Sequence, residues 1–246
     1  VVASPSHRRM GGYAELAIID EREAALKSPA LSHVEAASLP LVGLTAWDCL
    51  VRHGKLESGQ RVFIQAGSGG VGTIAVQLAR SLGAEVLTTC SARNAELVAS
   101  LGADRVIDYA REDYEQVAAG VDLVLESLGP AHLDRAYRMV RRGGRLITIS
   151  PGVPEAVARL GPYLGIARVG ASLLYRTVRY RLGKGVRFRA VTRKSDGEAL
   201  ARIMDLATNG AIVPVLDSVL PLADAAEAHR RLESGHRRGK VVLAVA

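Results

Sequence analysis

Cysteines, aromatic residues and long apolar runs are all scarce in this chain. Only two cysteines, Cys49 and Cys90, occur among 246 residues, which excludes a disulfide framework and the paired spacing of a zinc site. The six histidines are scattered and form no metal-binding pattern. No apolar run is long enough to span a membrane, and the first residues lack the basic-then-apolar pattern of a signal peptide. We therefore expect a cytoplasmic protein without a metal site.

Acidic residues are missing from one long stretch. Residues 156–195 contain ten arginines and lysines and no acid, in a chain whose net charge is +7. Such a stretch can bind nucleic acid or a membrane surface, form a solvated helix face, or attract an anionic cofactor and substrate. Two phenylalanines and one tryptophan offer little surface for stacking bases. We favour attraction of a small anion and expect no nucleic-acid partner.

The chain does have a glycine-rich turn between a strand pattern and a helix pattern. It lies in IQAGSGGVGTIAVQLAR at residues 64–80, where Gly67, Gly69 and Gly72 fit G-x-G-x-x-G. Glycines let the backbone approach a pyrophosphate, which binds the N–H groups at the helix N-terminus. A Walker loop would end in Gly-Lys-Ser/Thr, and this turn does not. The turn therefore predicts a dinucleotide site, with a tight turn that holds no ligand as the alternative.

The end of the next strand indicates which dinucleotide binds. Ser91 and Arg93 follow the strand pattern at 85–90, and no acid lies between residues 86 and 95. An NAD site usually has an acid there for the ribose hydroxyls, whereas an arginine offers planar donors to a 2′-phosphate. We therefore predict NADP(H). The alternative is that Arg93 only caps or solvates the next helix.

Strand and helix patterns alternate through most of the chain. Strands are expected at 61–66, 85–90, 105–108, 121–126, 145–150 and 186–191, with a largely helical insert from Pro151 to Lys184. Repeated βα units predict an α/β fold with a doubly wound parallel Rossmann sheet, which binds ligands at the carboxyl ends of its strands. Earlier in the chain, residues 11–20 alternate like an antiparallel strand. Residues 30–54 are expected to be helical, with Ser32 and Glu35 as a capping box.

Six motifs in sequence order resemble the medium-chain dehydrogenase/reductase superfamily: GGYAEL, SLPLVGLTAW, AGSGGVGTIAVQLAR, LGADRVIDY, RRGGRLITI and ESGHRRGKVVL. Within it, the chain is similar to the zinc-independent quinone oxidoreductase branch. The resemblance implies a remnant of a GroES-like β domain at 1–36, an NADP-binding Rossmann domain at 37–212, and a C-terminal segment at 213–246 that returns to the catalytic domain. It also implies an N-terminally truncated chain, because family members carry most of the GroES-like domain before this point. Members often dimerise by joining sheet edges, so a homodimer is an expectation.

The resemblance also assigns cofactor contacts to residues that match the family's motifs. These contacts follow the cofactor from the nicotinamide to the 2′-phosphate. The implied set is Thr45 beside the nicotinamide; Gly67, Ser68, Gly69, Gly70, Val71 and Gly72 at the pyrophosphate; Ser91, Arg93 and Tyr109 at the adenosine and 2′-phosphate; Leu128, Gly129 and Ser150 at the nicotinamide ribose; and Lys240 reaching back to the cofactor.

Two departures from the family pattern affect the expected chemistry. Aligned on the Gly43-Leu44-Thr45 motif, Leu41 stands where zinc alcohol dehydrogenases have a cysteine ligand, and a hydrocarbon cannot bind zinc. The part of the family's β domain that is missing supplies one wall of the substrate cleft, so no catalytic residue is assigned. We expect zinc-free, NADPH-dependent reduction of quinones or α,β-unsaturated carbonyls. The alternatives are an enoyl-thioester reductase and a non-catalytic protein that binds NADPH or RNA.

Overall fold

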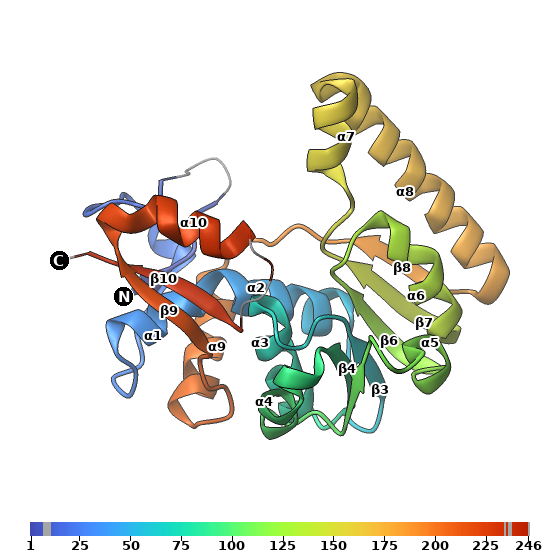
Figure 1. Ribbon diagram of the computed structural model, residues 1–246, viewed down its shortest axis with the longest axis horizontal. Helices are drawn as coiled ribbons and strands as arrows, with labels where there is room; N and C mark the ends of the chain where they lie inside the picture. Colours follow the sequence, from blue (N-terminus) through green and yellow to red (C-terminus); the bar gives the residue numbers. More distant parts are fainter. Residues whose placement is uncertain (7–10, 234, 236–237, 246) are drawn as a thin grey trace.

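The centre of the molecule is a parallel sheet of six strands. The computed structural model describes residues 1–6, 11–233, 235 and 238–245 (Figure 1). The sheet contains β3 (Arg61–Ile64), β4 (Glu85–Cys90), β5 (Arg105–Asp108), β6 (Val121–Glu126), β7 (Val140–Thr148) and β8 (Arg187–Ala190). Their order is β5-β4-β3-β6-β7-β8, so the chain runs outward from β3, returns to β6 and continues on the other side. The expected doubly wound α/β fold is confirmed.

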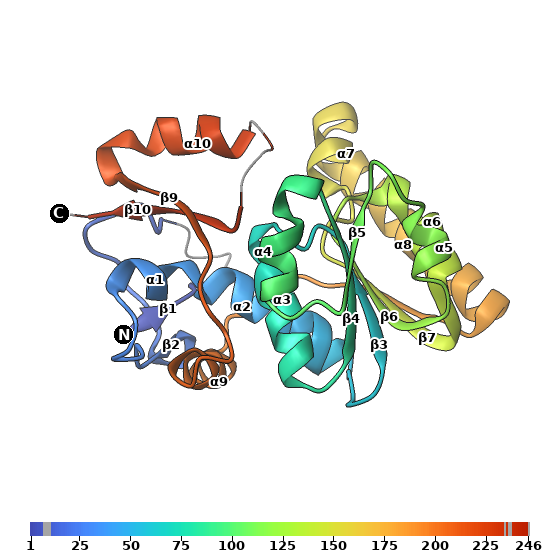
Figure 2. The same ribbon diagram turned by 60° about the horizontal axis from the view of Figure 1, so that its bottom comes forward.

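Helices cover both faces of this sheet (Figure 2). One core contains residues of α2 (Pro40–Trp47), α3 (Gly70–Ser81) and α4 (Ala95–Ser100), and the other contains residues of α5 (Tyr114–Val117), α6 (Leu133–Met139) and α8 (Pro162–Lys184). Successive strand side chains point to opposite faces. Val62 and Ile64 accordingly lie in the first core and Phe63 in the second.

The helix expected at 30–54 is broken into three segments. α1 (His33–Ser38) begins with the predicted capping box of Ser32 and Glu35, which is confirmed. Pro40 then starts α2, since proline is tolerated at the first position of a helix. The chain continues as a π-helical segment at Asp48–His53, a rare geometry that often occurs at functional sites.

The antiparallel strand expected at 11–20 is wrong. The structure has only bends and irregular backbone there, and Leu16 and Ile18 are about nine-tenths exposed, at 90% and 89%. A strand forms only when a neighbour pairs with it, and none of the described residues pairs with this segment. The antiparallel ladder that does form nearby joins β1 (Val2–Ala3) to β2 (Ala24–Ala25).

The insert and the C-terminal region lie on opposite sides of the molecule. α7 (Val153–Leu160) and α8 form a helical hairpin that projects from the sheet at the upper right of Figure 1. After α9 (Gly197–Thr208), the chain forms β9 (Leu216–Pro221), α10 (Ala225–Glu233) and β10 (Lys240–Ala244), and β9 and β10 pair in parallel as a separate sheet. Ser234, His236 and Arg237 of the C-terminal motif lie outside the described residues. Within the described ranges, no helix has the length and apolarity to cross a membrane.

The boundaries of β3, β7 and β8 differ from those expected. β8 is one residue shorter at each end, at Arg187–Ala190, and β7 ends at Thr148 rather than at residue 150. β7 begins at Val140 rather than at residue 145, and its pairing with β6 shifts register between Val121 and Leu123. β3 ends at Ile64, two residues before the expected end, because the chain turns into the glycine loop at Gln65.

Candidate functional site

The loop between β3 and α3 is packed too closely for side chains at two of its glycines. A Cβ on Gly72 would lie 2.2 Å from the carbonyl oxygen of Ala66, and a Cβ on Gly67 would lie 2.2 Å from Oγ1 of Thr88. Ala66 itself has a φ of +55°, which is uncommon for a residue with a side chain. The backbone therefore folds back on itself at the switch point of the sheet, where dinucleotides bind in this type of fold.

The N-terminus of α3 presents open hydrogen-bond donors. The helix has no side-chain cap, and its first internally bonded N–H is that of Thr73, 2.9 Å from the Gly69 oxygen. Among the described residues, the N–H groups of Gly70, Val71 and Gly72 have no acceptor. Free N–H groups at the positive end of a helix dipole suit a pyrophosphate.

The side chain of Asn94 supports this loop and was missed by the sequence interpretation. Its Nδ2 donates to Oγ of Ser68 at 3.0 Å, while its Oδ1 is buried with no hydrogen-bond partner. A buried, unpartnered acceptor is uncommon in folded proteins. The sequence does contain a signal for this role, because Asn94 directly follows Arg93 in the loop that is expected to bind the cofactor.

The C-terminal region closes over the same loop. Gly239 forms an isolated parallel bridge with Gly69, and its N–H donates to the oxygen of Ser68 at 2.9 Å. A Cβ on Gly70 would lie 2.9 Å from Cδ of Lys240. The structure thus brings Lys240 to the glycine loop, although the two are far apart in the sequence.

A second arginine lies beside Arg93. The guanidinium of Arg238 donates to the main-chain oxygen of Arg93 at 2.9 Å. The main-chain N–H of Arg238 donates to Oδ1 of Asp217 at 3.0 Å. Sequence reasoning missed Arg238 because it follows Arg93 by well over a hundred residues. The two arginines are brought together at the loop after β4.

A cavity lies at the carboxyl ends of β4 and β5. It measures ≈320 Å³, and its lining includes Ser91 and Asp108. Tyr109 is 59% exposed and is not part of the lining, nor is Arg93. Of the three residues expected to surround the adenosine and 2′-phosphate, the structure therefore places only Ser91 on this cavity.

A buried carboxylate binds the loop after β6, in addition to the hydrogen bonds between Ser127 and Gln65. Oε1 of Glu126 accepts the N–H groups of Leu128 at 2.6 Å and Gly129 at 2.5 Å, and Oε2 accepts the hydroxyl of Thr148. Burial raises the pKa of Glu126, although these hydrogen bonds act in the opposite direction. Gly129 has a φ of +105°, and a Cβ on it would lie 3.9 Å from Oγ of Ser150. The carboxylate thus sets the conformation of the rim on which Leu128, Gly129 and Ser150 lie together.

A cavity of ≈410 Å³ lies beside that rim. It extends from Leu128 and Gly129 to the α7–α8 hairpin. Leu160 and Val169 contribute apolar surface, and Glu155 is the acidic residue of the lining. Three basic side chains also line it: Arg159, Arg168 and Arg176.

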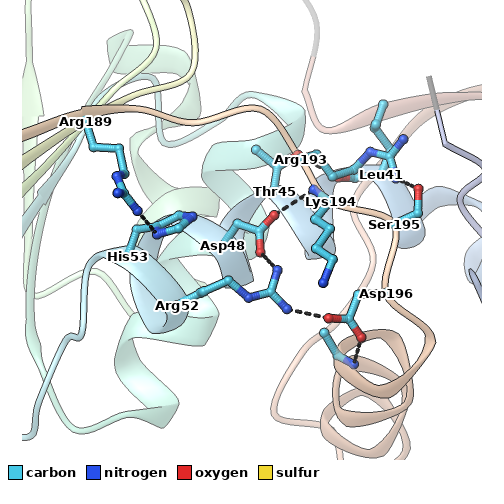
Figure 3. A network of polar contacts seen from close by, with 11 residues as sticks. Leu41, Thr45, Asp48, Arg52, His53, Arg189, Arg193, Lys194, Ser195 and Asp196 are labelled. Atoms are coloured by element: carbon cyan, nitrogen blue, oxygen red, sulfur yellow. Dashed lines mark hydrogen bonds and ion pairs between the residues drawn. The ribbon is translucent and has the colours of Figure 1, made fainter. Parts of the chain in front are cut away.

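The linker helix α2 carries Thr45 and Leu41 (Figure 3). Thr45 is nearly buried, at 9% exposure, and its hydroxyl donates to the Leu41 oxygen at 2.7 Å. Leu41 is 48% exposed, so a hydrocarbon faces outward where a zinc-dependent relative would need a ligand. The part of the chain that the structure describes contains no group of three or more histidine, cysteine or acidic residues that could hold a metal ion.

A buried ionic network attaches the linker helix to the rest of the molecule (Figure 3). Asp48, only 2% exposed, pairs with Arg52 and accepts the N–H of Lys194 at 2.8 Å. Arg52 also pairs with Asp196, which caps α9 through the N–H of Ala199 at 3.1 Å. Asp48 and Arg52 are four residues apart, but their contacts with Lys194 and Asp196 join residues far apart in the sequence, so pattern analysis does not reveal them.

Comparisons with known proteins show which family this chain is similar to. The family model described as zinc-binding dehydrogenase matches residues 101–243. The mitochondrial NAD(P)H oxidoreductase RTN4IP1 of Danio rerio is 33% identical, with 96% of this chain and 63% of that protein covered. A chloroplastic NADPH-dependent alkenal/one oxidoreductase of Arabidopsis thaliana is 30% identical, with 96% and 53% covered.

A solved structure shows the same arrangement. The quinone oxidoreductase from Coxiella burnetii superposes with a TM-score of 0.74 and 30% identity, over 89% of this chain and 63% of that one. The chain spans just over half to just under two thirds of the length of these relatives. On the family match, the chain belongs to the zinc-binding dehydrogenase family of the medium-chain dehydrogenase/reductase superfamily.

Proposed function

We propose that this protein is an NADPH-dependent reductase of quinones or α,β-unsaturated carbonyls that transfers a hydride without zinc. One observation carries the proposal: a glycine loop shaped for a dinucleotide lies after β3, and the ≈410 Å³ cavity begins at the end of the neighbouring strand β6. When bound, the nicotinamide cofactor supplies the hydride. The chain's own residues bind the cofactor, orient it and shape the substrate cavity.

The cofactor preference is proposed from charge. Arg93 and Arg238 place two cationic groups at the loop after β4, and no acidic residue occurs in that loop. Guanidinium groups suit a 2′-phosphate, whereas a carboxylate there would favour the free ribose hydroxyls of NAD(H). The oxidoreductases named above as relatives include one described as NADPH-dependent, which supports the same preference.

The substrate class is proposed from the cavity. Its apolar wall, with Leu128 and Val169, suits the carbon skeleton of a small electrophile. Three arginines against one glutamate give the cavity a positive field. That field stabilises negative charge as it develops on the oxygen of an enolate or hydroquinone, the role that zinc has in other members of the family. The exposed hydrocarbon of Leu41 supports a zinc-free reaction.

The proposal is tested by turnover of the full chain with NADPH and with NADH. The substrates are a benzoquinone, a simple enone and an enoyl thioester, followed by loss of the reduced-cofactor absorbance. We expect NADPH oxidation with the quinone or the enone, and a lower kcat/KM with NADH. Turnover of the thioester alone would move the assignment to an enoyl-thioester reductase. Tight NADPH binding without oxidation by any substrate would leave a non-catalytic role.

Three further expectations stay predictions. They are the division at residues 36/37 and 212/213, a homodimer, and a cytoplasmic location. Two relatives named above are described as mitochondrial and chloroplastic, so localisation has to be measured in the source organism.

A further inference from the structure

A cluster of basic side chains lies on the β7–β8 part of the sheet, apart from the cavities described above. It surrounds a separate cavity of ≈270 Å³. The cluster, which we call the β8 basic cluster, consists of Arg52, His53, Lys55, Arg145, Arg187 and Arg189, and no acidic residue lines this cavity.

The strand register forces like charges together in this cluster. Arg145 of β7 lies directly opposite Arg187 of β8, and Ile147 lies opposite Arg189. Because side chains alternate between faces, these positions share one face of the sheet. Like charges directly opposite each other destabilise a pair of strands, so the arrangement is unfavourable without a counter-ion.

Most of these cations have no acidic partner. Arg52 pairs with Asp48 and Asp196 (Figure 3). Among the described residues, by contrast, Lys55, Arg145 and Arg187 form no ion pair or side-chain hydrogen bond. Their positive charge is therefore not neutralised within the described part of the chain.

The imidazole of His53 also shows the excess of positive charge. Arg189 lies 2.8 Å from its Nδ1 (Figure 3). Burial, together with the charge of Arg189, lowers the pKa of His53. The ring thus takes the role of an acceptor for a guanidinium that has no carboxylate beside it.

Elsewhere on this sheet the chain pairs its arginines with acids. Arg61 at the start of β3 pairs with Glu85, and Arg141 near the start of β7 pairs with Asp122. The missing counter-ions at the β8 basic cluster are therefore a local feature of the chain. Arginine forks match phosphate oxygens in geometry and bind them more tightly than neutral donors do.

We propose that the β8 basic cluster binds a compact polyanion with two or more phosphate groups, such as inorganic pyrophosphate or tripolyphosphate. The cavity of ≈270 Å³ has room for such a group, and several cations line it from both strands and from the end of the π-helical segment. The site is distinct from the glycine loop and shares none of its residues. A nucleic acid is the less suitable occupant, because the aromatic residue in the lining, Phe188, is 8% exposed and offers little stacking surface.

The test is calorimetric titration of inorganic pyrophosphate and tripolyphosphate into the full chain saturated with NADP⁺, so that the glycine loop is occupied. We expect one site, tighter binding of tripolyphosphate than of pyrophosphate, and affinity that falls with salt. Arg145→Gln and Arg187→Gln should each weaken binding by about tenfold, the loss typical of one charge-assisted phosphate contact. Arg202→Gln is the matched control, because this exposed arginine of α9 undergoes the same charge change away from the cavity.

Thermal unfolding without phosphate gives a second readout, in which the substitutions that weaken phosphate binding should raise the unfolding temperature. Removing one like charge relieves repulsion, so Arg145→Gln should unfold at a higher temperature than the wild type, while losing the stabilisation that tripolyphosphate gives it. If Arg145→Gln does not fold, the exposed Arg187→Gln serves both measurements. Equal phosphate affinity in Arg145→Gln, Arg187→Gln and Arg202→Gln would overturn the proposal. So would binding of a short RNA under conditions in which neither phosphate binds.

Discussion

Two loops leave the carboxyl ends of the neighbouring strands β3 and β6, and they are held in different ways. The loop at 66–72 is held mainly by its own backbone: a Cβ on Gly72 would lie 2.2 Å from the main-chain oxygen of Ala66, and the N–H of Gly69 donates to the same oxygen at 2.9 Å. The loop at 127–130 is held by side chains: the buried carboxylate of Glu126 accepts two of its N–H groups, and Oε1 of Gln65 accepts the N–H of Ser127 at 3.3 Å. The conformation of the first loop therefore requires glycine, which has no Cβ, at Gly72. The conformation of the second loop depends on the protonation state of Glu126.

The largest expected effect is on the backbone-held loop. In Gly72→Ala, the new methyl would lie 2.2 Å from the Ala66 oxygen and 2.8 Å from Cα of Gly67, and neither atom can rotate away. We expect a loss of about 3 kcal/mol or more in the free energy of unfolding, as for other severe backbone or packing conflicts, together with loss of NADPH binding. Urea denaturation and fluorescence titration measure the two effects.

The matched control is Gly170→Ala in α8. A Cβ there meets nothing within 4 Å, so the substitution should stabilise the helix by about 0.5–1 kcal/mol. If Gly72→Ala unfolds at the same urea concentration as the wild type, the loop is not held by its backbone packing.

The next largest effect is on cofactor preference, and it tests the charge beside the first loop without changing the loop's conformation. Arg93→Ala should raise the KM for NADPH by about tenfold, the value of one charge-assisted contact, and leave the KM for NADH nearly unchanged. Arg238→Ala should act in the same direction but less strongly, because part of its guanidinium is already bound to the Arg93 oxygen. Steady-state kinetics with both cofactors measures this, and urea midpoints close to that of the wild type show that the shape is intact. An equal rise for both cofactors would contradict a 2′-phosphate role for these arginines.

The contrast between backbone constraints and side-chain contacts also explains which features could be predicted from the sequence. The glycine spacing and the βα alternation predicted the doubly wound parallel sheet and the 66–72 loop, because local backbone constraints leave a local pattern. Residues 11–20 show the opposite case, since alternation alone could not reveal that no described strand pairs with them.

The contacts missed by the sequence interpretation have a common origin. Arg238 reaches Arg93, and Lys194 reaches Asp48, only through the tertiary fold. Glu126 could be read as the polar end of a strand, but not as the acceptor that shapes the next loop. Side-chain roles of this kind depend on distances that no short spacing encodes.

The smallest expected effect is that of Glu126→Gln in the 127–130 loop, and it depends on pH. Glutamine resembles the protonated form of Glu126, because its oxygen can accept both N–H groups and its amide can donate to Thr148. Glu126→Gln should therefore cost less than about 1 kcal/mol at low pH, whereas Glu126→Ala, which leaves both N–H groups without an acceptor, should cost about 2–4 kcal/mol.

The direction of the pH effect follows from the raised pKa of Glu126. The folded protein holds this proton to a higher pH than the unfolded chain does, so the contribution of Glu126 to stability is full below the unfolded pKa. It is lost as the pH rises through the folded pKa. The unfolding free energy of the wild type minus that of Glu126→Gln should therefore fall as the pH is raised from about 4.3, the ordinary value for glutamate, towards neutrality. Urea titrations of both proteins across that range measure the difference. A difference that stays constant would mean that hydrogen bonding to the carboxylate offsets its burial. A difference that rises with pH would mean that hydrogen bonding outweighs burial, so that the ionised carboxylate binds the 127–130 loop more strongly than the protonated acid does.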